Sequence, residues 1–135
     1  RARLKESPYD FSFSGIKTSV LQHLKSQDQQ EWKAHVPDIA ASFQEAVVDM
    51  LINPTVSAAL AQKVNRIVLA GGVAANSRLR EKINESAATE NLQVYFPSAK
   101  FCTDNAAMIA LTGHHWINRG RRDDFAVNAD ADLTL

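Results

Sequence analysis

Two short apolar runs, each followed by a helical period, set the order of elements in the second half of the chain. The runs "RIVLA" (residues 66–70) and "LQVYF" (residues 92–96) are rich in β-branched and aromatic residues, which is typical of strands buried in a parallel sheet. Helical spacing of apolar residues follows over residues 74–88 and 103–117. The pattern predicts an α/β layered fold with two neighbouring parallel strands.

The helix predicted over residues 74–88 is amphipathic. Its inner side carries Leu79 and Ile83, and we expect four charged residues on its outer side: Arg78, Arg80, Glu81 and Lys82.

The first half of the chain reads as one strand followed by helices. "YDFSFSG" (residues 9–15) alternates aromatic and small residues and predicts a half-buried strand, and residues 16–26 predict a helix. A longer helix is expected from Pro37-Asp38, ended by Asn53-Pro54, with a second helical stretch from Thr55 to about Val64. The apolar stripe of the longer helix is Ile39, Phe43, Ala46, Val47, Met50 and Leu51.

Length, charge and cysteine content indicate the domain organisation and the cellular compartment of the protein. The 135 residues predict one domain, with a linker at residues 1–10, an α/β lobe at 11–120 and a tail at 121–135. Lys plus Arg and Asp plus Glu number 15 each, so bulk charge gives no reason to expect nucleic-acid binding. We expect no membrane segment and no secretory signal, and the single cysteine fits a reducing, cytoplasmic compartment. The chain lacks an initial Met, which hints at a fragment.

Gly71 and Gly72 form a corner between the first strand and the helix after it. Ligands of open α/β sheets sit at the carboxyl ends of strands, where glycine lets the backbone approach them. Asn76, expected in the first helical turn, offers an acceptor and donors. The corner lacks the GxGxxG and GxxxxGK[ST] phosphate patterns. From spacing alone, a ligand corner and a plain tight turn both remain open.

A second corner, "FPSAKFCTDNAAMIA", repeats this arrangement around Thr103 and Asp104. Thr103 is a candidate N-cap, and Asp104 is then a first-turn carboxylate that complements the helix dipole. Alternatively, Asp104 is a metal ligand at the mouth of a cleft, on the same sheet edge as Gly71. The other candidate ligands lack converging spacing: His23, His35, His114 and His115. Cys102 is close to Asp104, but a lone cysteine beside a helix start is more often a small buried apolar residue.

Three segments in series, "DFSFSGIKTSV", "LAGGVAANSRLR" and "FCTDNAAMIA", closely resemble the second half of the universal tRNA threonylcarbamoyl-adenosine transferase family, the family of bacterial TsaD. Its members were formerly described as O-sialoglycoprotein endopeptidase, or glycoprotease. The resemblance covers about residues 10–120. It implies the second lobe of an actin-like, Hsp70-type ATPase (ribonuclease H-like) fold.

The resemblance also implies an activity and a set of site residues. The enzyme would transfer a threonylcarbamoyl group from the ATP-derived threonylcarbamoyl-adenylate to the adenosine beside the anticodon of tRNAs that read codons beginning with A. Gly71, Gly72 and Asn76 would contact the adenylate or nucleotide, and Asp104 would bind one iron or zinc ion. The implied partners are tRNA and accessory proteins, including an inactive paralogue.

One departure from the family pattern concerns the metal. The family's other ligands come from an HxxxH motif in its first half, and no HxxxH occurs in these 135 residues. The first lobe is absent too, so we expect a fragment that is inactive by itself. The alternatives are an inactive dimerisation paralogue, the older endopeptidase assignment, and a sugar kinase of the same fold.

Overall fold

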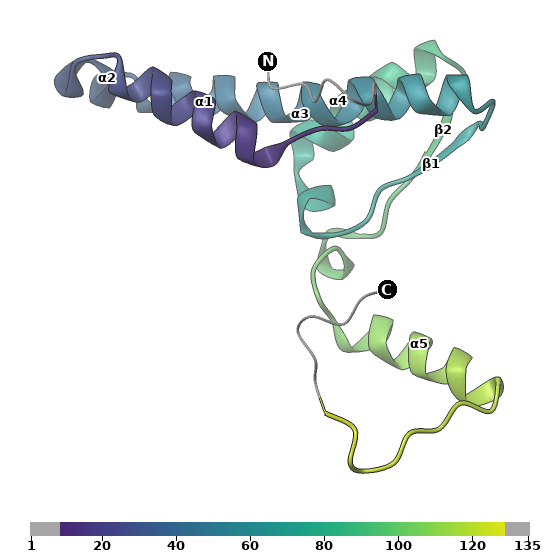
Figure 1. The fold of residues 1–135 in the computed structure, drawn as a ribbon. Helices are drawn as coiled ribbons and strands as arrows, with labels where there is room; N and C mark the ends of the chain where they lie inside the picture. Colours follow the sequence, from purple (N-terminus) through teal and green to yellow (C-terminus); the bar gives the residue numbers. More distant parts are fainter. Residues whose placement is uncertain (1–8, 129–135) are drawn as a thin grey trace. The chain divides into compact units, whose positions relative to one another are not determined.

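The computed structural model describes residues 9–128, which form helices and one small parallel sheet (Figure 1). The first compact unit ends at Cys102 and the second begins at Thr103, and each is described by itself. The elements, in chain order, are α1 (Phe13–Lys25), α2 (Gln29–Ala34), α3 (Val36–Ala61), β1 (Arg66–Val68), η1 (Gly72–Ala75), α4 (Ser77–Thr89), β2 (Gln93–Tyr95), η2 (Ala99–Phe101) and α5 (Ala106–Asn118).

The sheet consists of β1 and β2, which pair in parallel with Ile67 opposite Val94. Helix α4 connects the two strands, so the predicted β-α-β order and the α/β class are confirmed. Figure 1 shows α4 beside the long helix α3. Within residues 9–128, no helix is both long and apolar enough to cross a membrane.

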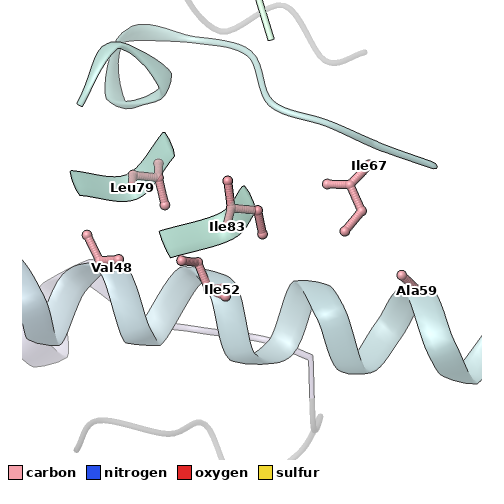
Figure 2. Close-up of a cluster of buried hydrophobic side chains, with 6 residues drawn as sticks. All are labelled: Val48, Ile52, Ala59, Ile67, Leu79 and Ile83. Atoms are coloured by element: carbon pink, nitrogen blue, oxygen red, sulfur yellow. The ribbon is translucent and has the colours of Figure 1, made fainter. Parts of the chain in front are cut away.

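The core of the first unit lies between α3, α4 and β1. Figure 2 shows its six buried side chains pointing toward one another: Val48, Ile52, Ala59, Ile67, Leu79 and Ile83. Ile83 is 1% exposed, and burying a side chain of this size contributes roughly 1.5–3 kcal/mol. The buried positions Leu79 and Ile83 confirm the predicted inner face of α4.

The predicted strand over residues 9–15 is wrong, because α1 begins at Phe13. Ser12 is the N-cap, and its Oγ accepts a hydrogen bond from the Gly15 N–H at 3.1 Å. This local bond satisfies a free donor of the first helical turn, which favours the helix over an extended chain. Phe11 and Phe13 still contact each other, edge to face, with ring centroids 5.5 Å apart.

The predicted helix end at Asn53-Pro54 is also wrong, because α3 continues through Pro54 to Ala61. A proline inside a helix costs about 3 kcal/mol through the lost N–H and a steric clash. The buried residues Val48, Ile52 and Ala59 lie on both sides of Pro54, and their common packing offsets this cost. Thr55 Oγ1 also donates to the Leu51 carbonyl at 2.7 Å.

The most buried edge of α3 differs from the predicted apolar stripe. Val48 and Ile52 were outside that stripe, and its members, such as Phe43 and Leu51, are half-buried. Helix α3 contacts α2, α4 and β1, so apolar positions on several of its sides have partners. When a helix packs against several neighbours, its most buried residues cannot be predicted from a single apolar stripe in the sequence.

Candidate functional site at the glycine corner

The backbone at Gly71 has a conformation that requires glycine. Its φ of 85° and ψ of 171° lie in a region that residues with a Cβ rarely adopt. A Cβ added there would meet nothing within 4 Å, so the restriction comes from the backbone and not from crowding. Gly72 then begins the short helix η1, in which the Ala74 N–H donates to the Gly71 carbonyl at 3.0 Å. The predicted sharp corner is present.

The sequence predicted Asn76 in the first turn of the helix. In the structure it is the N-cap of α4, immediately before that turn. Its Oδ1 accepts from the Leu79 N–H at 3.0 Å, and its Nδ2 donates to Gln44 Oε1 of α3 at 3.1 Å. Half of the donor capacity of Nδ2 is therefore used by Gln44, and the second N–H remains for another acceptor. Asn76 therefore has a structural role as a cap, and its contact with a ligand stays a prediction.

An apolar cavity of about 360 Å³ adjoins the glycine corner. The corner residues 68–74 line it on one side, and α3 and α4 contribute Leu51, Ile52, Leu79 and Ile83. Phe11, Phe13 and Thr55 also line it. Apolar walls with a few polar groups at the edge are typical of sites that bind small organic ligands.

Arg80 joins the corner to the segment that follows β2. Its Nε donates to the Ala74 carbonyl at 2.6 Å, and its Nη2 donates to the Pro97 carbonyl at 2.7 Å and lies 3.1 Å from Cys102 Sγ. The guanidinium carbon also lies 4.5 Å from the centroid of the Phe96 ring. The predicted outward position of Arg80 is therefore wrong, because its long side chain turns back along α4 to these acceptors.

Charged residues of α3 and α4 form a cluster beside the corner. Glu45 binds Arg78 through two bonds, at 2.9 and 3.1 Å, and also pairs with Lys82. Lys82 Nζ lies 2.6 Å from Asp49 Oδ1, and Arg78 also binds Glu81 at 2.7 Å.

The hydrogen bonds in this cluster shift the pKa values of its charged side chains. Those from Arg78 and then Lys82 lower the pKa of Glu45 to about 2. Hydrogen bonds from Asp49 and Glu45 raise the pKa of Lys82, and those from Glu45 and Glu81 raise that of Arg78. Arg78 and Lys82, predicted outside, instead face α3, and the cluster joins the two helices.

The second corner has a different helix start from the one predicted. Asn105, not Thr103, is the N-cap of α5, and its side chain accepts from the Met108 N–H at 3.1 Å. Its Nδ2 donates to the Thr103 carbonyl at 2.9 Å. Asp104 therefore precedes the cap and is not in the first helical turn. It is exposed and belongs to the second unit, so its placement near Gly71 stays a prediction.

The other candidate ligands do not gather around Asp104. Across residues 9–128, no three His, Cys, Asp or Glu side chains are grouped as a metal site requires. His35 lies 3.5 Å from Asp38, His114 contacts Asn118, and Cys102 is buried against Arg80.

The sequence analysis missed two residues of the first corner. Gln44 and Arg80 are the side chains that contact Asn76 and Ala74, from 32 and six positions away in the chain. No motif marks Gln44, because its role depends on α3 lying beside α4. Arg80 lies four residues after the cap, a position that gives a charged side chain access to the preceding loop, and this spacing was a usable signal.

The profile of a protein family matches residues 1–111 of the chain; that family is TsaD, tRNA N6-adenosine threonylcarbamoyltransferase. The chain belongs to this family. The TsaD match includes the glycine corner, the Arg80 contacts and the second corner with Asp104.

Individual TsaD relatives are similar along all or nearly all of the chain. A tRNA N6-adenosine threonylcarbamoyltransferase of Kosmotoga olearia is 49% identical over 135 residues, which is 100% of this chain and 40% of the relative. That of Caldicellulosiruptor saccharolyticus is 43% identical over 94% of this chain and 38% of its own length. The chain thus spans about two fifths of the length of these curated relatives.

Proposed function

We propose that this chain is the second lobe of an enzyme that transfers the threonylcarbamoyl group of threonylcarbamoyl-adenylate to the adenosine beside the anticodon of tRNAs reading codons that begin with A. The single observation that carries the proposal is the TsaD profile match over residues 1–111. The relatives' names specify transfer to N6 of adenosine in tRNA. The reaction forms a bond from N6 to the carbamoyl carbon and releases AMP from that carbon.

The glycine corner is proposed to hold the adenylate. The apolar cavity beside Gly71 and Gly72 suits a planar ring, and the unused N–H of Asn76 is available to an oxygen or nitrogen of the ligand. The backbone geometry of the corner is set by contacts within this chain, which favours a site that needs little ordering on binding. The role of this lobe is to hold the activated carbonyl in place for attack by the tRNA amine.

The metal is a separate matter, because residues 9–128 by themselves do not make a metal site. We propose only that Asp104 contributes one carboxylate ligand to an iron or zinc ion whose remaining ligands lie outside this chain. An exposed carboxylate can accept this role, since iron and zinc both bind carboxylate oxygen. When bound, such an ion supplies Lewis-acid polarisation of an oxygen.

We further propose that the whole enzyme acts in the cytoplasm with accessory proteins, one of them an inactive paralogue. The relatives' name, which specifies tRNA as the substrate, supports tRNA as the macromolecular partner. The neutral overall charge of the chain suggests that most of the tRNA surface is bound elsewhere in the enzyme or its partners.

The experiment is a transfer assay on the protein at the full length of its relatives. The protein is incubated with threonylcarbamoyl-adenylate and an unmodified tRNA that reads a codon beginning with A, and the nucleosides are analysed by mass spectrometry. We expect threonylcarbamoyl-adenosine to form. Its absence, when the accessory proteins are supplied, would favour the inactive paralogue. Phosphorylation of a sugar would indicate the kinase, and cleavage of a sialoglycoprotein would restore the endopeptidase assignment.

A further inference from the structure

Arg80 connects two segments that the sequence separates by more than twenty residues. One is η1 at the glycine corner, whose Ala74 carbonyl accepts from Nε. The other is the segment after β2, where Nη2 reaches both the Pro97 carbonyl and Cys102 Sγ. All of these atoms belong to the first unit of the structure.

The chemistry of the guanidinium explains why one side chain can hold both segments. Arginine presents five N–H donors in a rigid planar fork, and its flat face can stack on an aromatic ring. Arg80 uses the edge of the fork for its three polar contacts and its face for Phe96, at 4.5 Å. A lysine at this position would offer one compact ammonium and could not make the same set of contacts.

The residues around Arg80 show that segment 97–102 is folded around its guanidinium. Cys102 is only 4% exposed, and its Sγ lies 3.7 Å from the Ser98 carbonyl and 3.9 Å from that of Pro97. The segment 97–102 is therefore folded around the sulfur and the guanidinium. In contrast, Arg78 on the same helix binds only carboxylates among its described hydrogen-bond partners, Glu45 and Glu81.

We infer that Arg80 is a positioning residue that holds η1 of the glycine corner against segment 97–102 and thereby keeps the corner ready for a nucleotide. This inference rests on the proposed function, because it assigns the nucleotide to that corner. Arg80 makes its contacts with backbone carbonyls, a sulfur and a ring of its own chain, so it acts on the ligand through Ala74 and the rest of η1. Its loss leaves η1 with its own turn but without the external anchor.

The test compares the full-length wild type with Arg80→Gln and Arg80→Lys, and with Arg78→Gln as a control that removes a half-buried arginine of the same helix. Hydrogen exchange is followed at the N–H groups of Ala74, Asn76, Phe101 and Cys102, which all bond within the two segments. Binding of ATP is measured by calorimetry, and far-UV circular dichroism confirms the fold.

In Arg80→Gln we expect faster exchange in both segments and ATP binding weaker by on the order of tenfold, with Arg80→Lys intermediate and Arg78→Gln close to the wild type. Unchanged exchange in either segment, or unchanged ATP affinity with faster exchange, would overturn the inference. An equal loss in Arg78→Gln would also overturn it, since the effect would then come from general loosening of α4. A wild type that binds no ATP would instead refute the proposed nucleotide site, and the exchange data would still decide whether Arg80 joins the two segments.

Discussion

The two strand-to-helix corners of this chain both begin a helix with an asparagine, but their surroundings differ. Asn76 caps α4 and also bonds to Gln44 of α3, and Arg80 anchors the corner beside it. Asn105 caps α5 and bonds to Thr103, two residues away, while Asp104 between them is exposed. The first corner is thus fixed by long-range contacts within this chain.

The difference indicates which part of the site this chain can build. At the glycine corner, residues of α3 and α4 meet in the described structure and set the backbone geometry. At the second corner, Asp104 is exposed and no metal-ligand group forms among residues 9–128, so a carboxylate ligand there needs further ligands from elsewhere. The chain spans about 40% of the Kosmotoga relative, which leaves room for such residues in the full protein.

The largest effect should come from the second corner. In the full-length protein, we expect Asp104→Ala to remove both the bound metal and the transfer activity, because a metal site that loses a ligand loses affinity steeply. The 135-residue chain itself should bind no stoichiometric iron or zinc. Elemental analysis of both proteins, purified without chelator, measures this.

The matched control for that prediction is Asp123→Ala, which removes an exposed carboxylate of the same unit that lies 4.0 Å from Arg121. It should leave metal content and activity unchanged. Stoichiometric metal on the short chain would show that its own residues supply further ligands, and the proposed contrast between the two corners would then be lost.

The next effect concerns the packing that supports the first corner. Ile83→Ala should destabilise the chain by about 2–5 kcal/mol, because a fully buried side chain is replaced by a cavity. Glu85→Ala, on the exposed side of the same helix, should change the free energy of unfolding by less than about 0.5 kcal/mol. Urea denaturation measures both. Equal, small effects would show that α4 is not packed on α3 as Figure 2 depicts.

The sequence predicted the elements that local patterns define, and failed where tertiary contacts decide. The apolar runs at β1 and β2 and the inner face of α4 needed only periodicity and residue type. The helix through Pro54 could not be predicted, because the packing of Val48, Ile52 and Ala59 outweighs a strong local signal. Gly71 was recognisable because its backbone conformation depends on the residue itself, whereas Gln44 is defined only by the approach of two helices.

A smaller effect separates the two roles of Asn76. Asn76→Ala should lower the stability of the chain by about 1 kcal/mol through the lost cap, and weaken nucleotide binding in the full-length protein by on the order of 1–3 kcal/mol. Asn76→Asp should keep the cap, since a carboxylate also accepts from the Leu79 N–H, but lose the Nδ2 donor. Calorimetry with ATP and urea denaturation distinguish these outcomes.

The companion variant at the second corner is Asn105→Ala, in which the lost cap should cost about 1 kcal/mol of stability. If Asn76→Asp binds ATP as tightly as the wild type, the amide of Asn76 does not contact the nucleotide. The two asparagines would then be equivalent caps, and the contrast between the corners would rest on the backbone at Gly71 alone.

The smallest effect is electrostatic and concerns the cluster that joins α3 to α4 beside the first corner. The hydrogen bonds from Arg78 and Lys82 lower the pKa of Glu45 from 4.5 to about 2. A carboxylate whose pKa is lower in the folded state contributes stability that is fully present above pH 4.5 and is lost as the pH falls toward about 2.

We therefore expect Glu45→Gln to be less stable than the wild type at neutral pH, with a difference that narrows as the pH falls from 4.5 toward about 2. The side chain of Glu45 is 39% exposed, so solvent screening keeps the effect small. Urea denaturation across the window measures it, and the same comparison in an Arg78→Gln background should show a weaker pH dependence, because the largest cause of the shift is then gone. A pH dependence that is the same in both backgrounds would mean that Arg78 does not set the titration of Glu45, and that Lys82 is the partner that does.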